Sequence, residues 1–121
     1  GGTGTAIAAG TAITTTTTLF IYDGTGTTPN CFSEENVTIT INDTPVVNDL
    51  ADVTACDTFT LPAITGTNLT GGESYYTGTG GTGTAIAAGT AITTTTTLFI
   101  YDGTGTTPNC FSEENVTITI N

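Results

Sequence analysis

A perfect internal repeat constrains this chain more than any other feature of its sequence. Residues 1–42 and residues 80–121 are identical at every position, so the sequence repeats with an offset of 79 residues. In the first copy the repeated segment runs directly into Asp43, which opens the next unit. A period of this length is typical of small independent domains, because the coils of solenoid proteins usually repeat every ~20–45 residues. The sequence therefore predicts one complete repeat, 43–121, preceded by the C-terminal part of another, 1–42.

The composition indicates an all-β protein. Thr accounts for 35 of the 121 residues and Gly for 16, while 36% of the residues are hydrophobic. Thr suits the pleated, half-buried surface of a strand, and Gly is typical of turns. The hydrophobic fraction is too high for a disordered acidic chain. No apolar stretch approaches the ~18 residues that a membrane-spanning helix needs, so no membrane span is expected in this segment.

The charge excludes several functions. The chain has no Lys, Arg or His and eleven acidic residues, which give a formal charge of −11. Binding to nucleic acid is excluded because phosphate contacts need Lys or Arg. Without His or Lys the chain cannot build a Ser-His or Cys-His pair or a Schiff base. Glu113 and Glu114 are adjacent, so on a strand they point to opposite faces and cannot act as a facing carboxylate pair. We therefore expect no enzyme.

Alternating patterns predict the strands. Val116, Ile118 and Ile120 alternate with Thr residues, and residues 92–101 alternate in the same way before an expected turn at Asp102-Gly103. Shorter strands are expected at 53–61, at 75–76 and within 84–91, with a loop at 77–84. Six or seven short strands in 79 residues predict a small antiparallel β-sandwich of immunoglobulin-like type, repeated in a tandem array.

The cysteines suggest a disulfide. Cys56 and Cys110 lie in the complete repeat, and Cys31 is the equivalent of Cys110 in the partial one. We predict that Cys56 pairs with Cys110 and that Cys31 pairs with a Cys of the preceding repeat, which would imply an oxidising, extracellular compartment. A bond between Cys31 and Cys56, or free thiols, are the alternatives. A metal site at the cysteines is poorly supported without His or a CxxC pair.

Four segments together resemble a known family: DLADVTACDTFTLPAITGTN, YYTGTGGTGT, TLFIYDGTGTTPNC and VTITIN. In this order they resemble the tandem immunoglobulin-like repeats of giant surface proteins of the Bacteroidetes, the gliding-motility-type adhesins exported by the type 9 secretion system. The resemblance covers residues 43–121 and the partial copy. It implies a secreted, surface-anchored or filamentous adhesin and carries no catalytic residues. It also implies that the Asp-Thr pairs at Thr44 and Thr58 could be O-glycosylated.

Calcium is the only cofactor that the sequence suggests. Oxygen-bearing side chains gather around the junction between the repeats and just inside the complete one: Asp43, Asn48, Asp49 and Asp52. Calcium takes six to eight oxygen ligands, and residues from two adjacent repeats could share one ion. The favoured alternative is that these are solvated loop residues, because no EF-hand spacing is present.

Two classes of function remain at this stage. The chain is expected to be a structural or adhesive module of a long extracellular protein, a spacer or stalk whose partners are neighbouring repeats of the same chain. Alternatively, each repeat binds surface polysaccharide weakly and the array gains avidity, with Tyr76 as the exposed aromatic contact. If the chain were the whole subunit, a neighbouring copy in a filament would have to complete its partial repeat by strand addition. The run Thr93–Thr97 and its copy Thr14–Thr18 are interpreted as exposed strand positions, with sugar attachment or ice or polysaccharide binding as alternatives.

Overall fold

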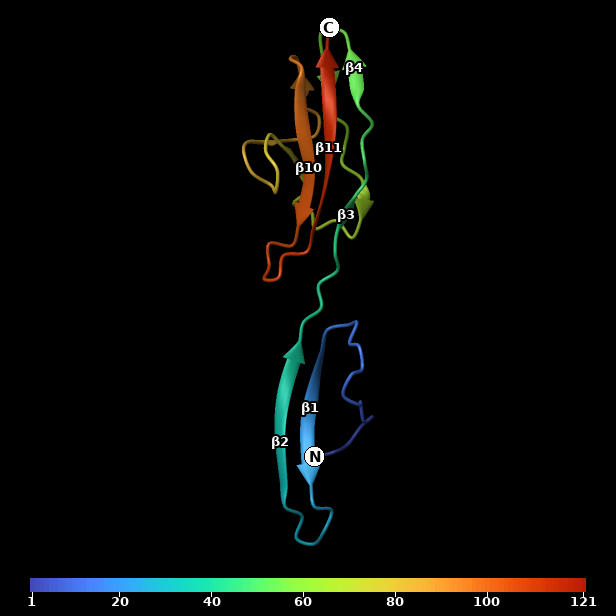
Figure 1. Ribbon diagram of the computed structural model, residues 1–121, viewed down its shortest axis with the longest axis vertical. Helices are drawn as coiled ribbons and strands as arrows, with labels where there is room; N and C mark the ends of the chain where they lie inside the picture. The colour runs from blue at the N-terminus through green and yellow to red at the C-terminus, as the bar shows by residue number, and fades with distance from the viewer. The chain divides into compact units, whose positions relative to one another are not determined.

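The computed structural model describes residues 1–121 as an all-β chain without helices (Figure 1). It divides into two compact units, Gly1–Asn42 and Asp43–Asn121, and this boundary coincides with the repeat boundary in the sequence. The predicted fold class, a small antiparallel β-sandwich, is confirmed by the second unit.

The second unit contains nine strands in three sheets. A five-stranded sheet has the order β4-β11-β10-β7-β8, and two two-stranded sheets, β3-β6 and β5-β9, make up the rest of the sandwich. The bounds of the strands are β3 Val46–Val47, β4 Val53–Ala55, β5 Phe59–Thr60, β6 Gly66–Thr67, β7 Ser74–Tyr76, β8 Ala85–Ile86, β9 Ala91–Ile92, β10 Thr96–Gly103 and β11 Phe111–Ile120.

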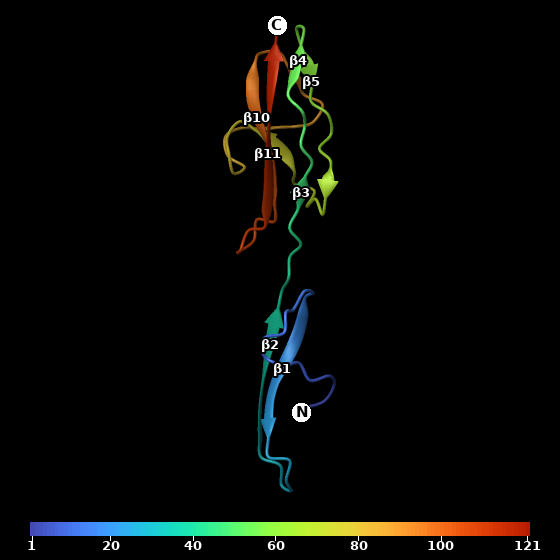
Figure 2. The ribbon, with the colours of Figure 1, turned by 45° about the vertical axis from the view of Figure 1, so that its right-hand side comes forward.

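The long β10–β11 hairpin is the centre of the five-stranded sheet. Its strands pair antiparallel from Thr96↔Ile118 to Gly103↔Phe111. On one side β7 pairs antiparallel with β10, and on the other side β4 pairs parallel with β11. The turn after β4 then leads the chain out of this sheet into β5 (Figure 2). Residues 43–76 therefore supply the neighbours on both edges of the hairpin.

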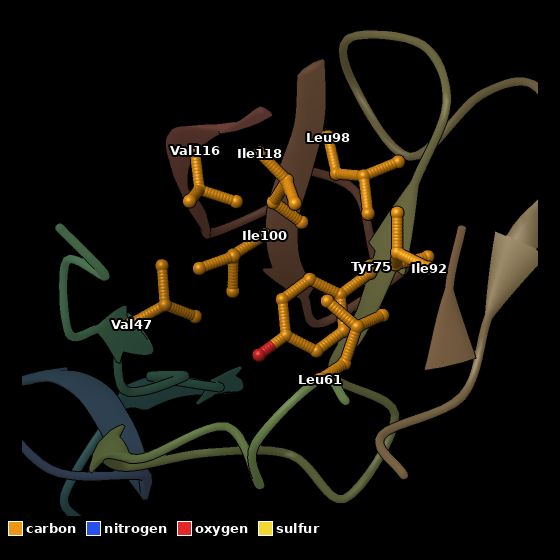
Figure 3. Close-up of a cluster of buried hydrophobic side chains, with 8 residues drawn as sticks. All are labelled: Val47, Leu61, Tyr75, Ile92, Leu98, Ile100, Val116 and Ile118. Carbon is orange, nitrogen blue, oxygen red and sulfur yellow. The ribbon is translucent and has the colours of Figure 1, made fainter. Parts of the chain in front are cut away.

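The core lies between the inner face of the five-stranded sheet and the two smaller sheets. On β10 and β11 the inward positions alternate along each strand, as the sequence predicts, and Ile100 and Ile118 are 2% and 0% exposed. Tyr75 reaches into the same cluster from β7 (Figure 3). The buried hydrophobic side chains are Val47, Leu61, Tyr75, Ile92, Leu98, Ile100, Val116 and Ile118.

Three details of the predicted strands are wrong. Residues 92–101 do not form one strand, because β9 pairs with β5 whereas β10 begins at Thr96 in the five-stranded sheet. The chain crosses between the sheets at 93–95, where the Thr95 hydroxyl accepts a hydrogen bond from the Ile120 backbone N–H (2.9 Å). Similarly, 53–61 is divided into β4 and β5 by a turn in which Asp57 has a φ of 64°. Asp102 and Gly103 belong to β10 and form no turn.

The first unit contains two strands, β1 (Thr17–Gly24) and β2 (Phe32–Ile39). They pair in the register of the β10–β11 hairpin, from Thr17↔Ile39 to Gly24↔Phe32. Residues 1–16 contain no strand. This unit is therefore a two-stranded sheet with the sequence of the hairpin at the centre of the second unit.

Candidate functional site

A row of aromatic side chains on the outer face of the five-stranded sheet is the main candidate site. The ring of Tyr101 lies edge-to-face against Tyr76, with centroids 6.0 Å apart, and stacks on Phe111 at 5.8 Å. Phe111 is 54% exposed, whereas the two tyrosines are half-buried. The row runs across three neighbouring strands, β7, β10 and β11. We refer to these three residues as the aromatic row.

Two glycines and an amide hold Tyr101 flat on the sheet. A Cβ on Gly81, which has a φ of +72°, would lie 3.0 Å from the Tyr101 ring, and a Cβ on Gly103 would lie 2.6 Å from its hydroxyl oxygen. Asn109 Nδ2 donates a hydrogen bond to the same hydroxyl oxygen over 2.9 Å. Beside the row, the Gly80 backbone N–H donates to Glu113 Oε2 over 2.6 Å. The ring position is therefore fixed by close backbone approach that larger residues would prevent.

The chemistry of the aromatic row is that of a stacking surface. Aromatic rings offer large apolar area together with polar edges, and the nearby Glu113 and Asn109 provide hydrogen-bonding groups. The first unit has the equivalent stack between Tyr22 and Phe32, with centroids 5.8 Å apart. It has no equivalent of Tyr76, which comes from 43–79. The complete aromatic row is thus a property of the complete repeat.

Tyr75 and Tyr76 face opposite sides of β7. Tyr75 is 1% exposed and its hydroxyl donates to the Pro62 carbonyl oxygen over 2.8 Å, whereas Tyr76 belongs to the aromatic row. Burial raises the pKa of Tyr75 above its ordinary value of 10.0. Tyr76, predicted as the exposed aromatic contact, is thus half-buried on the outer face, while Tyr75 belongs to the core.

Asp102 is a buried carboxylate that sequence reasoning missed. It is fully buried, and its Oδ2 accepts a hydrogen bond from the Thr70 backbone N–H over 2.8 Å. The Thr70 hydroxyl donates a short hydrogen bond to the other carboxylate oxygen. Asp102 continues the inward series of Leu98 and Ile100, and this alternation was the available signal. These hydrogen bonds connect the loop before β7 to the β10–β11 hairpin.

The predicted disulfide between Cys56 and Cys110 is wrong. All three cysteines are free thiols. Cys110 directly precedes β11, whereas Cys56 follows Ala55, which pairs with Ile120 at the other end of that strand. At about 3.3 Å per residue, the ten-residue strand separates them by roughly 30 Å. A disulfide needs Cα atoms within about 7 Å, so the parallel pairing of β4 with β11 prevents the bond.

The alternative pairing of Cys31 with Cys56 has no support either. Cys31 directly precedes β2, so it lies at the end of that strand away from the repeat boundary at Asn42. Cys56 lies at the end of β11 away from the entry of the chain into the second unit, because Val47 near that entry donates from its backbone N–H to Ser112 Oγ over 3.0 Å. Both thiols are free in the structure.

Calcium binding at Asp43, Asn48, Asp49 and Asp52 stays a prediction, and the structure gives hydrogen-bond partners for two of these residues. The acidic members Asp43, Asp49 and Asp52 form no group that could hold a metal ion. Asp52 Oδ1 accepts a hydrogen bond from the Thr117 backbone N–H over 2.9 Å, and Asn48 Nδ2 donates to Thr65 Oγ1 over 3.1 Å. Two of the four residues thus bind other parts of the repeat.

The remaining candidate positions lie on the surface. Thr44 and Thr58, the predicted glycosylation positions, are both exposed. Thr97 in the Thr run is exposed, and its hydroxyl lies 3.2 Å from that of Thr117 on the neighbouring strand. The predicted glycosylation positions Thr44 and Thr58 and the Thr97 position of the Thr run are therefore accessible on the surface.

The comparisons with known proteins assign no relative. No protein-family model, curated protein or solved structure matches the chain. The structure also contains no helix that is long and apolar enough to cross a membrane.

Proposed function

We propose that the chain is a structural repeat module of a long extracellular surface protein, in which it acts as a spacer or stalk. The observation that carries this proposal is the contrast between two identical segments. In residues 80–121 the inner face of the hairpin is covered by residues 43–79, whereas in residues 1–42 the same face is exposed. A complete 79-residue repeat thus encloses a hydrophobic core of its own, as a module that is repeated in series requires.

The second unit is suited to linear connection. Its chain enters near Ser112, at the start of β11, and leaves at Asn121 beyond the other end of the same strand. The points of entry and exit therefore lie at opposite ends of β11. The uniform negative charge keeps such an array soluble, because like charges on neighbouring repeats repel each other.

The denatured, reduced mass of the native protein tests this proposal. A tandem array predicts a mass many times the 12.2 kDa of this chain. Peptides that span the boundary between VTITIN and DTPVV should be recovered in excess over any unique terminal peptide. A native mass close to 12.2 kDa would refute the array.

Polysaccharide binding is a second candidate function, and the aromatic row favours it. Stacked and edge-on rings beside Asn109 offer the combination of apolar area and hydrogen-bonding groups that the ring faces of sugars match. Identical repeats would then bind with avidity. The test is titration of the chain with extracellular polysaccharide. Tyr76→Ala should abolish saturable binding, while Thr97→Ala on the same face should not, and flat titrations with the unaltered chain would refute binding.

A further inference from the structure

The carboxylate of Glu113 lies directly beside the aromatic row. Glu113 is opposite Tyr101 in the antiparallel register of β10 and β11, and it is two residues from Phe111 along β11. All three side chains therefore lie on the outer face of the five-stranded sheet. Glu113 is half-buried, and the hydrogen bond from the Gly80 backbone N–H fixes its position. The row thus combines aromatic rings with one negative charge held next to them.

The side chains of the repeat offer no cation to pair with this charge. The chain contains no Lys, Arg or His, so no side chain can form an ion pair with Glu113. A cationic partner must therefore come from outside the repeat. A cation that reaches Glu113 also comes close to the rings of Tyr101 and Phe111, whose negative π faces attract it. An ion pair and a cation–π contact are thus available at one place.

The charge of the protein selects among polysaccharides. A sugar chain with carboxylate or sulfate groups would bring like charges to Glu113, in a protein whose formal charge is −11. A neutral sugar chain can stack on the rings but leaves the carboxylate without a new partner. A sugar with a free amino group supplies an ammonium ion for Glu113 together with apolar C–H faces for the rings. Amino sugars therefore match the row better than neutral or acidic sugars.

The length of the row favours a sugar chain over a basic peptide. The three rings span the neighbouring strands β7, β10 and β11, which corresponds to roughly 10 Å at about 4.8 Å per strand. One Lys or Arg side chain covers a single ring, whereas successive sugar units of a polymer can contact successive rings. A linear polymer of amino sugars thus satisfies both the rings and the carboxylate.

We propose that the aromatic row and Glu113 form a binding surface for a cationic polysaccharide, a linear polymer whose sugars carry free amino groups. The sugar rings stack on Tyr76, Tyr101 and Phe111, and one ammonium group pairs with Glu113. This inference rests on the polysaccharide-binding candidate above, because it names the class of sugar for the same surface. It does not depend on the role of the repeat as a spacer.

The test compares two soluble oligosaccharides that differ only at the amino group, the β-1,4-linked hexamer of glucosamine and its fully N-acetylated form. Both are titrated against the 121-residue chain by calorimetry at mildly acidic pH, where the free amines are protonated. About 0.15 M salt screens the long-range field of the protein. We expect about 10-fold tighter binding of the glucosamine hexamer, because the ion pair and the cation–π contact each contribute a few-fold.

Two neighbouring acids provide a matched pair of variants. Glu113→Gln removes the charge but keeps an acceptor for the Gly80 N–H, so it should reduce the preference for the glucosamine hexamer to about threefold or less. Glu114→Gln makes the same change in net charge at an exposed position that points to the opposite side of β11, and it should leave the preference unchanged. Tyr76→Ala should abolish saturable binding of both hexamers, because it removes one ring of the row.

Four results would overturn the proposal: equal affinity for the two hexamers, no binding of either, an unchanged preference in Glu113→Gln, or hexalysine binding as tightly as the glucosamine hexamer. The last result would identify a basic peptide as the partner. Equal affinity that is still lost in Tyr76→Ala would refute the amino-sugar preference and leave polysaccharide binding in place. None of these results bears on the mass of the native protein, so the proposed tandem array is tested separately.

Discussion

Residues 1–42 and residues 80–121 have one sequence in two surroundings, and they differ only where distant residues take part. The hairpin register is the same in both, and so is the loop after the first strand. In that loop Asn30 accepts from the Gly26 backbone N–H over 3.0 Å, and Asn109 accepts from the Gly105 backbone N–H over 2.9 Å. The hairpin and its loop therefore need no contact from the rest of the repeat.

The short strands behave differently. Residues 85–86 and 91–92 form β8 and β9, which pair with β7 and β5 from residues 43–79. Their equivalents, 6–7 and 12–13, form no strand in the first unit. A two-residue strand has few hydrogen bonds of its own, so its existence depends on its partner. The comparison shows which parts of the repeat are local and which are conferred by the other half.

The largest expected effect comes from placing a charge at the same inward position in each copy. Ile100→Asp should destabilise the second unit by about 3–5 kcal/mol, because it removes core packing and buries a charge. Ile21→Asp should change stability by less than about 0.5 kcal/mol, as is usual at exposed positions. Urea unfolding followed by near-UV circular dichroism measures both. Equal losses in the two variants would show that the first unit also buries this face.

The buried carboxylate should give the next largest difference. Asp102→Ala leaves the Thr70 backbone N–H without its partner and should cost about 2–3 kcal/mol. Asp23→Ala should be almost neutral, because Asp23 is exposed. The same unfolding experiment compares the two variants. A neutral Asp102→Ala would mean that Thr70 finds water or another acceptor in the folded repeat.

A smaller effect is expected from Tyr75, which has no counterpart in the first unit. Tyr75→Phe removes the hydrogen bond to Pro62 and should cost about 1 kcal/mol. Because burial raises the pKa of Tyr75, the unfolded state releases this proton first as the pH rises above about 10, and the stability of the repeat falls there. The unaltered chain should therefore lose more stability than Tyr75→Phe between neutral and alkaline pH. Parallel pH profiles would contradict this assignment.

The smallest effects should be equal in the two copies. Asn30→Ala and Asn109→Ala each remove the acceptor of a loop amide in an exposed hairpin and should cost about 0.5–1 kcal/mol locally. Hydrogen exchange of the Gly26 and Gly105 amides measures this loss. Similar acceleration in both copies would confirm that the loop is local, whereas a larger change in one copy would show that its surroundings support it.

The division of the repeat into parts that form locally and parts that depend on distant residues also explains what could be predicted from the sequence. The alternation around Val116 and Ile118 predicted their burial correctly, because a period of two is visible in the strand itself. The crossing between sheets at 93–95 was not visible, since a run of Thr shows no contrast between the two faces. The burial of Asp102 depends on Thr70, which is 32 residues away.

The candidate site was predicted less well than the fold. Tyr76 and Tyr101 could be named from the sequence as aromatic candidates, but their contact with each other and with Phe111 required knowledge of strand order. The disulfide prediction failed because the spacing of two cysteines does not show at which end of a strand each lies. The direction of β4 relative to β11 determines this, and no local pattern encodes it.

The parallel pairing of β4 with β11 also determines how a repeat carries mechanical load. A force that pulls the two ends of the second unit apart draws β4 toward its start and β11 toward its end. Parallel neighbours then slide past each other, so the hydrogen bonds between 53–55 and 118–120 are strained together and do not open one after another. The hydrogen bonds that the Thr117 backbone N–H donates to Asp52 and that the Asn121 backbone N–H donates to Ala55 are loaded by the same shear force. In the tandem array proposed above, tension along the chain would load every complete repeat in this shear geometry.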